Sequence, residues 1–167
     1  MNGERASANL PRIYLETTLF NYFHLSDPAR RTEIDATKRL FEHVRERRFD
    51  PYVSEVVISE LKRCPEDGRR EAMLKTIADY GIPTIPAGSH EAFRDLAGKY
   101  VAVGAIPPHK MDDALHIAIA SLSRMDILAS WNCSHIVRYR TQQAVHDINL
   151  ALGISPLAIH TPLELIY

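Results

Sequence analysis

The chain contains little cysteine. Cys64 and Cys133 are its two cysteines among 167 residues, too few for the disulfide framework that stabilises small secreted domains. A chain of this length buries roughly two thirds of its unfolded surface, so its core can fold without cross-links or a structural metal. The low cysteine count therefore suits a reducing compartment and favours the cytoplasm.

Long apolar runs are also missing. Residues 1–10 are polar and lack the apolar segment of a signal peptide. Elsewhere, no uncharged apolar run is long enough to span a bilayer. We therefore expect a cytoplasmic protein without a membrane segment, with a flexible N-terminus over residues 1–10 and a single domain over residues 11–167.

Neither sign of charge is in excess. The chain has 20 Lys and Arg against 21 Asp and Glu, a net charge of −1, whereas general nucleic-acid binders are usually basic. Any contact with RNA must therefore come from a local patch. Lys110, His135, Arg138 and Arg140 form one candidate patch for phosphates, although such loop charges can equally just face solvent.

Short apolar runs alternate with amphipathic stretches along the chain. We expect strands at 12–15, 52–53, 84–85, 127–129 and 157–159, and helices at 19–23, 32–48, 55–63, 66–80, 89–103, 111–123 and 141–152. This alternation predicts an α/β fold with three layers, α/β/α, around a short parallel sheet of four to five strands.

Individual residues predict where helices begin and which elements lie at the edge or in the interior. Thr17 or Thr18 is expected to cap the first helix, and Ser89 the helix at 89–103. Pro83 and Pro86 flank the strand at 84–85, which places it near a sheet edge because proline cannot donate to a strand ladder. The helix at 111–123 is apolar around most of its circumference, so we expect it deep against the sheet.

Four polar side chains stand where predicted elements meet. Glu16 ends the first strand, Asn132 follows the strand at 127–129, Asp113 begins the buried helix, and Glu60 lies in the helix after the second strand. In a parallel sheet these places lie along the carboxyl edge, where ligands gather. Glu16 as a structural cap or ion-pair partner, Asp113 as a first-turn helix acid, and Glu60 as a solvated residue remain alternatives.

Four segments resemble the PIN domain family, small nucleases with an RNase H-like fold that include the VapC-type toxins of toxin–antitoxin pairs. They read Ile-Tyr-Leu-Glu-Thr-Thr-Leu-Phe-Asn-Tyr (13–22), Val-Ser-Glu-Val-Val-Ile-Ser-Glu-Leu (53–61), Asp-Ala-Leu-His-Ile-Ala (113–118) and Ser-Trp-Asn-Cys-Ser-His-Ile-Val (130–137). The resemblance implies that Glu16, Glu60, Asp113 and Asn132 occupy the positions of the four family acids, and thus the catalytic site.

Two of these positions depart from the family pattern. The first family acid is usually aspartate, and the longer Glu16 moves its carboxylate by roughly an ångström, a distance that matters for catalysis. Asn132 replaces the fourth acid with an amide, which keeps an oxygen ligand but loses a charge. We expect one tight site for Mg²⁺ or Mn²⁺, held by Glu16, Asp113 and Asn132, with Glu60 as a proton acceptor or as the holder of a water molecule.

The eight histidines suggest no zinc site by their spacing relative to the cysteines, and we expect an all-oxygen ligand set without histidine. His116 lies one turn after Asp113 and either orients that carboxylate or is a satisfied core histidine. Thr17 and Ser130 either support the ligands or act as helix caps. Trp131 either stacks on a base or packs under its loop.

The function that these features favour is metal-dependent cleavage of RNA by a toxin of a toxin–antitoxin pair. The alternative is a PIN-like domain of weak or lost activity that binds RNA or a protein. RNA, a protein antitoxin and a second copy of the chain, forming a homodimer, are the expected partners. We place protein association on residues 19–48, where Phe20, Tyr22 and Phe23 precede an apolar stripe of Leu40, Phe41 and Val44.

Overall fold

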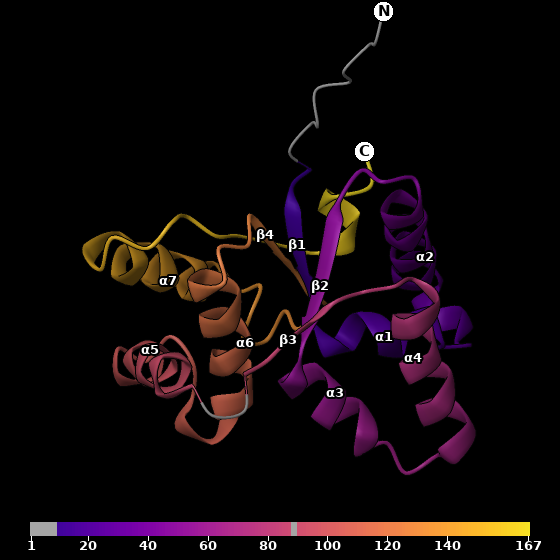
Figure 1. Cartoon of the computed structure of the whole chain (residues 1–167), viewed down its shortest axis with the longest axis horizontal. Helices are drawn as coiled ribbons and strands as arrows, with labels where there is room; N and C mark the ends of the chain where they lie inside the picture. Colours follow the sequence, from indigo (N-terminus) through magenta and orange to yellow (C-terminus); the bar gives the residue numbers. More distant parts are fainter. Residues whose placement is uncertain (1–9, 88–89) are drawn as a thin grey trace, which may run out of the picture.

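A computed structural model describes residues 10–87 and 90–167. Five parallel strands form one sheet in the order β3-β2-β1-β4-β5 (Figure 1). The strands are β1 (Arg12–Leu15), β2 (Asp50–Ser54), β3 (Thr84–Ile85), β4 (Ile127–Ala129) and β5 (Ala158–His160). The predicted α/β fold with a short parallel sheet is confirmed, and β3 lies at the edge, as its flanking prolines indicated.

Helices cover the sheet on both sides. They are α1 (Thr17–Phe23), α2 (Arg31–Arg45), α3 (Glu55–Lys62), α4 (Asp67–Asp79), α5 (Glu91–Ala102), α6 (Met111–Leu122) and α7 (Tyr139–Ala151). Helices α1, α2 and α4 lie to one side of the strands and α5, α6 and α7 to the other (Figure 1). Three short 3-10 turns begin at Pro28, Pro108 and Pro162.

The core lies between the sheet and these helices. Residues 13–15 of β1, the middle strand, are fully buried, which is typical of a parallel strand covered on both faces. Residues 117–120 of α6 are also fully buried. The predicted depth of this helix is therefore confirmed, and its N-terminus is held close to the carboxyl ends of the strands.

Two predictions concern residues for which no structure is described. The flexible N-terminus at 1–10 lies outside the described residues except for Leu10, and so does the proposed cap Ser89. Helix α5 begins at Glu91, with His90 in the N-cap position and no capping bond from its side chain. None of the helices in the described part of the chain is long and apolar enough to cross a membrane.

The aromatic stretch in α1 and the stripe of α2 belong to the core. Phe20, Leu40 and Phe41 are fully buried and Val44 is 7% exposed. The Phe20 and Phe41 rings meet edge to face with centroids 5.6 Å apart, and the Phe23 ring packs 4.7 Å from Phe41. These side chains therefore belong to the core, whereas Tyr22 is only half-buried, and association through residues 19–48 stays a prediction.

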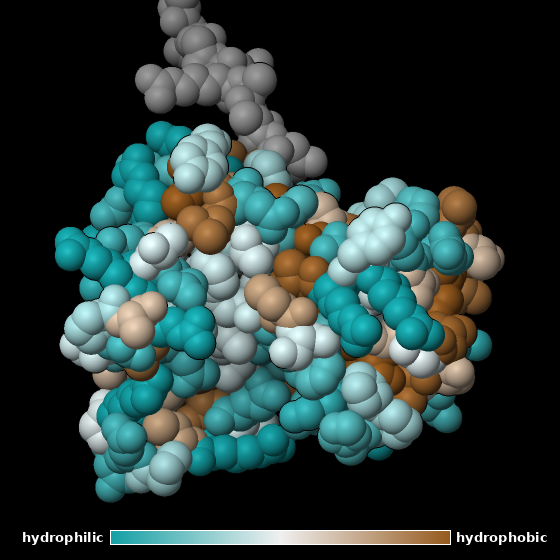
Figure 2. All heavy atoms as spheres, turned by 180° about the vertical axis from the view of Figure 1, so that it is seen from behind, coloured by the Kyte–Doolittle hydropathy of each residue, from teal (hydrophilic) through white to brown (hydrophobic). Residues whose placement is uncertain are grey.

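Exposed apolar side chains gather elsewhere. Val103 at the end of α5 and Leu150 and Leu152 at the end of α7 are 50% or more exposed, and an apolar groove of about 310 Å³ lies between these helix ends. In the view from behind, apolar residues reach the surface at this side of the molecule (Figure 2).

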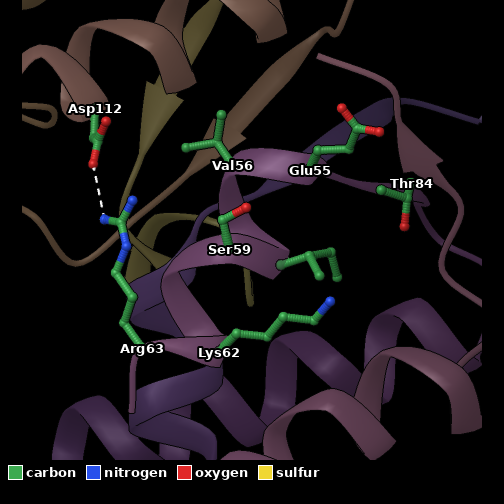
Figure 3. A pocket seen from close by; sticks show the side chains of 8 residues that line it. Glu55, Val56, Ser59, Lys62, Arg63, Thr84 and Asp112 are labelled. Carbon is green, nitrogen blue, oxygen red and sulfur yellow. Dashed lines mark hydrogen bonds and ion pairs between the residues drawn. The ribbon is translucent and has the colours of Figure 1, made fainter. Parts of the chain in front are cut away.

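A larger groove, of about 650 Å³, borders α3, β3 and the start of α6 (Figure 3). Arg63 forms an ion pair across one end of it, with its Nη1 atom 3.2 Å from Oδ2 of Asp112. Glu16, Glu60 and Asp113 are not among its lining residues. This groove is therefore distinct from the place where the predicted site residues lie.

Candidate metal centre

Glu16 connects the middle strand to the first helix. Its backbone N–H donates to the carbonyl of Ala129 at 3.1 Å, which fixes it beside the end of β4. Glu16 is itself the N-cap of α1, since its side chain accepts a hydrogen bond from the Thr18 backbone. The predicted cap at Thr17 or Thr18 is wrong, because the Glu16 carboxylate accepts the free N–H of Thr18 in the first turn of the helix.

The Glu16 carboxylate is 3% exposed and densely hydrogen-bonded. Its Oε2 accepts from the Thr18 N–H at 3.1 Å, the Thr18 hydroxyl at 2.5 Å and the Ser130 hydroxyl at 2.8 Å. Burial raises the pKa of Glu16, and the charge of His116 and these hydrogen bonds offset only part of the rise. The other oxygen, Oε1, lies 4.0 Å from Nε2 of His116.

Glu60 approaches the same point from α3. Its Oε2 accepts hydrogen bonds from the Thr17 hydroxyl and from Nε2 of His116, the latter at 3.0 Å. Burial alone would raise the pKa of Glu60, but the hydrogen bond and positive charge of His116, together with Thr17, lower it overall. Glu60 is therefore a carboxylate held in its ionised form, with 20% of its side chain exposed.

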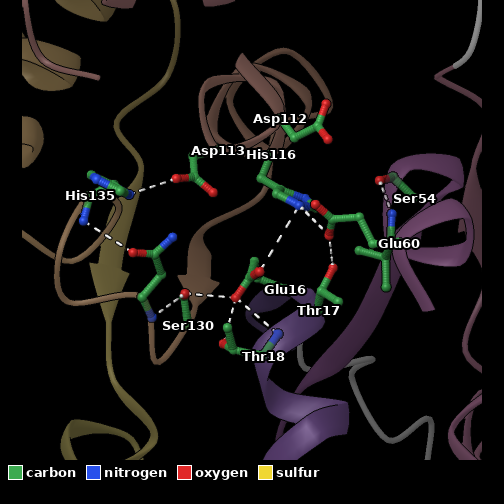
Figure 4. A network of polar contacts seen from close by, with 12 residues as sticks. Glu16, Thr17, Thr18, Ser54, Glu60, Asp112, Asp113, His116, Ser130 and His135 are labelled. Carbon is green, nitrogen blue, oxygen red and sulfur yellow. Dashed lines mark hydrogen bonds and ion pairs between the residues drawn. The ribbon is translucent and has the colours of Figure 1, made fainter. Parts of the chain in front are cut away.

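His116 joins the two carboxylates from α6. It is fully buried, and its Nδ1 lies 2.7 Å from the Tyr14 hydroxyl, which also meets the Ser54 hydroxyl at 2.7 Å. Burial opposes charge on this ring, yet Glu60, Glu16 and Asp113 together raise the pKa of His116 above its ordinary value. Tyr14 contacts the imidazole on one side, and on the other side the ring faces Glu60 and Glu16 (Figure 4).

Glu16, Glu60 and His116 form a group suited to a metal ion. One ligand atom from each lies within 4.8 Å of the others, and two carboxylates with an imidazole are a donor set that divalent transition metals accept. This group contains a histidine, which the expected all-oxygen ligand set does not. The sequence predicts His116 as a partner of Asp113 or as a core residue, and its position one turn after Asp113 in a buried helix is the signal that places it near the site.

Asp113 faces a different partner. Its Oδ2 lies 2.9 Å from Nδ1 of His135, and this buried oxygen accepts no hydrogen bond among the described residues. Asp112, its neighbour, pairs instead with Arg63. The two adjacent aspartates thus point apart, as their angular offset on a helix requires.

Asp113 nevertheless borders the metal group. It lines a pocket of about 280 Å³ together with Glu60 and Asp112, and its charge contributes to the raised pKa of His116. Figure 4 shows the side chains of Asp113, Glu60, His116 and Glu16 near one another. The three acids thus come together, at the end of the sheet where β1 and β4 meet α1 and α6.

Asn132 supports the loop after β4. Its Oδ1 accepts from the His135 backbone N–H at 3.0 Å, and its own backbone N–H donates to the Ser130 hydroxyl at 2.9 Å. Since Ser130 also donates to Glu16, Asn132 is two hydrogen bonds away from that carboxylate. Its side-chain oxygen is thus partly used by the loop.

Searches for similar proteins gave evidence on the fold. No protein-family model and no curated protein matches the chain. A chain in the structure of FitAB bound to the IR36 DNA fragment superposes with a TM-score of 0.51, covering 90% of this chain and 94% of that one.

The fold is PIN-like. The sequence identity to that FitAB chain is 15%, so the likeness concerns the path of the backbone and not the chemistry of the site. What the site contains must therefore be argued from its own residues, and these include a buried group of acids and a histidine that could hold a metal.

Proposed function

We propose that this protein is a metal-dependent endoribonuclease of the PIN type and the toxin of a toxin–antitoxin pair. One observation supports this most directly. Two carboxylates and an imidazole present ligand atoms within 4.8 Å of one another at the carboxyl end of the central strands, beside a third carboxylate, Asp113, whose buried oxygen lacks a hydrogen bond. Such clusters use a divalent cation to cleave phosphodiesters.

The residues fit a divalent ion. Glu16 would offer Oε1, because the hydrogen bonds from Thr18 and Ser130 all reach its Oε2, while Glu60 and His116 would exchange their mutual contact for the ion. A bound Mg²⁺ or Mn²⁺ would supply Lewis-acid activation of water and of the scissile phosphate. We retain Asp113 and Asn132 as candidate ligands on the open side, Asp113 directly and Asn132 through its amide oxygen.

The surrounding hydroxyls keep these ligands in place. Thr18 and Ser130 hold one oxygen of Glu16, Thr17 holds Glu60, and Tyr14 orients the imidazole of His116. Such outer contacts fix both the direction and the protonation state of metal ligands. Glu60, ionised and partly exposed, is the base we propose for taking a proton from the attacking water.

Association with partners is the second part of the proposal. The likeness to a chain of FitAB, a toxin–antitoxin complex, supports a protein antitoxin as one partner. For a homodimer, the exposed apolar residues Val103, Leu150 and Leu152 at the ends of α5 and α7 add a second candidate surface to the predicted residues 19–48. The two cysteines support the cytoplasm as its location.

RNA cleavage by the purified protein tests the proposal. Cleavage should require Mn²⁺ or Mg²⁺, stop with a chelator, and fall by about a hundredfold or more in Glu60→Gln and in Asp113→Asn. Asp112→Asn is the matched control, because Asp112 precedes Asp113 but pairs with Arg63 outside the cluster. Cleavage that survives both site variants, or that Asp112→Asn removes equally, would refute this active site.

A second candidate function is a PIN-like binding module with little activity. Glu16, longer than the usual aspartate, has three hydrogen bonds on one oxygen, and Asn132 supplies no charge. If the protein cuts no RNA with any metal tested, while the double variant Glu16→Asp with Asn132→Asp does, this second function is the correct one.

A further inference from the structure

A groove of about 590 Å³ lies beside the metal centre and is not part of it. Tyr22 from α1, Arg30 from the turn before α2, and Trp131 and Asn132 from the loop after β4 are among its lining residues. None of the metal-binding group, Glu16, Glu60 or His116, lines it. The groove thus brings aromatic, cationic and amide side chains together next to the proposed scissile phosphate.

The aromatic wall of the groove is fixed in place. The rings of Tyr22 and Trp131 are 5.5 Å apart between centroids and inclined by 37°. The indole Nε1–H of Trp131 donates to the Thr37 hydroxyl at 2.8 Å, which ties the ring to α2 while leaving the residue half-buried. An aromatic surface whose rotamer is already set binds a flat ligand at a low entropic cost.

The groove also carries one exposed cation. The Arg30 side chain is 54% exposed, and its Nη1 donates to Glu33 at 3.0 Å. A guanidinium beside aromatic rings can contact a phosphate or stack on a base. Asn132 adds an amide, a group that can both donate to and accept from a base edge.

The groove and the metal centre share one loop. The Trp131 backbone N–H donates to the Thr18 hydroxyl at 2.9 Å, and that hydroxyl donates to Glu16. Ser130, one residue earlier, donates to the same carboxylate (Figure 4). A strand whose phosphate lies at Glu16 is therefore within reach of the aromatic wall through its neighbouring nucleotide.

We propose that this groove binds an unpaired base of single-stranded RNA next to the phosphate that is cut, with Tyr22 and Trp131 as stacking surfaces and Arg30 as the contact to the backbone. The inference rests on the proposed ribonuclease function and adds a site that determines which nucleotide is accepted. Stacking needs an exposed base face, so single strands should bind and duplexes should not.

Fluorescence tests this directly, because Trp131 is the single tryptophan of the chain. In chelator, where cleavage is blocked, a short single-stranded RNA should change Trp131 emission in a saturable way, and a duplex of the same length should not. Arg30→Gln and Tyr22→Leu should each weaken binding about tenfold. Arg31→Gln should leave it unchanged, since Arg31 is 85% exposed, pairs with Asp35 and does not line the groove.

The outcomes separate this inference from the ribonuclease proposal. If RNA changes the Trp131 emission in a saturable way but the protein cuts no RNA, base binding in the groove is supported and the ribonuclease proposal is refuted. Metal-dependent cleavage without any emission change, or equal RNA affinity in wild type and Arg30→Gln, would refute the groove. Equal responses to single strand and duplex would overturn it too, as would emission changes caused by a protein partner but not by RNA. Circular dichroism confirms that the variants are folded.

Discussion

Nε2 of His116 lies 3.0 Å from Oε2 of Glu60. This contact joins α6 to α3, although the two residues are 56 positions apart in the sequence. It also places an imidazole among the acids that the sequence predicts for the site. A metal entering the site would replace a proton between these two side chains, so metal binding, protonation and stability are coupled here.

Metal preference should depend on His116. Because imidazole is a better ligand for Mn²⁺ than for Mg²⁺, calorimetry should show tighter Mn²⁺ binding in the wild type and a smaller difference in His116→Gln, with Mn²⁺ affinity reduced about tenfold or more. His146→Gln is the control, as His146 is exposed on α7. Unchanged Mn²⁺ affinity in His116→Gln would exclude the imidazole as a ligand.

The metal-free protein should be most stable at mildly acidic pH. The pKa of His116 is raised, so its contribution is complete below the ordinary value of 6.5 and is lost as pH rises through the folded-state pKa. The pKa of Glu60 is lowered, so its contribution is present above 4.5 and is lost as pH falls. Melting temperatures in chelator should peak between these values. A melting temperature that does not change with pH, in the wild type and in His116→Gln alike, would contradict the link between the protonation of these side chains and stability.

Replacing the charge of Glu16 should separate stability from function. Burial raises the pKa of Glu16, so Glu16→Gln, which removes the buried charge, should raise the melting temperature of the metal-free protein. The stabilisation that Mn²⁺ gives the wild type should disappear in this variant. Thermal melts with and without Mn²⁺ measure both effects, and an Mn²⁺-dependent shift that persists would remove Glu16 from the ligand set.

Restoring a charge at position 132 should tighten metal binding. Aspartate can still accept the hydrogen bond that Asn132 receives from the His135 backbone, so Asn132→Asp should preserve the loop while adding negative charge near the cluster. We expect about tenfold tighter Mn²⁺ binding at low salt. Gln143→Glu is the control, because Gln143 is exposed on α7 and the substitution adds a negative charge there. Weaker binding in Asn132→Asp would show that residue 132 is no ligand.

The sequence by itself determined the order and type of the elements. The predicted strands at 12–15, 84–85 and 127–129 match the observed ones residue for residue, because short apolar runs bounded by proline, glycine or polar caps leave few choices to a parallel sheet. The depth of α6 could also be predicted, since a helix apolar around its circumference has to be buried.

The tertiary structure decided which side chains meet. Glu16 and Glu60 were expected at one edge of the sheet, but His116 between them, and His135 beside Asp113, depend on how α3, α6 and the loop after β4 are rotated against one another. A pattern of residue types predicts which face of a helix is buried, but not the exact direction in which each side chain points. The packing of the core then fixes how each helix is rotated, and so sets the position of each side chain to within about an ångström. A displacement of that size decides whether a side chain can bind a metal ion or only lies near it.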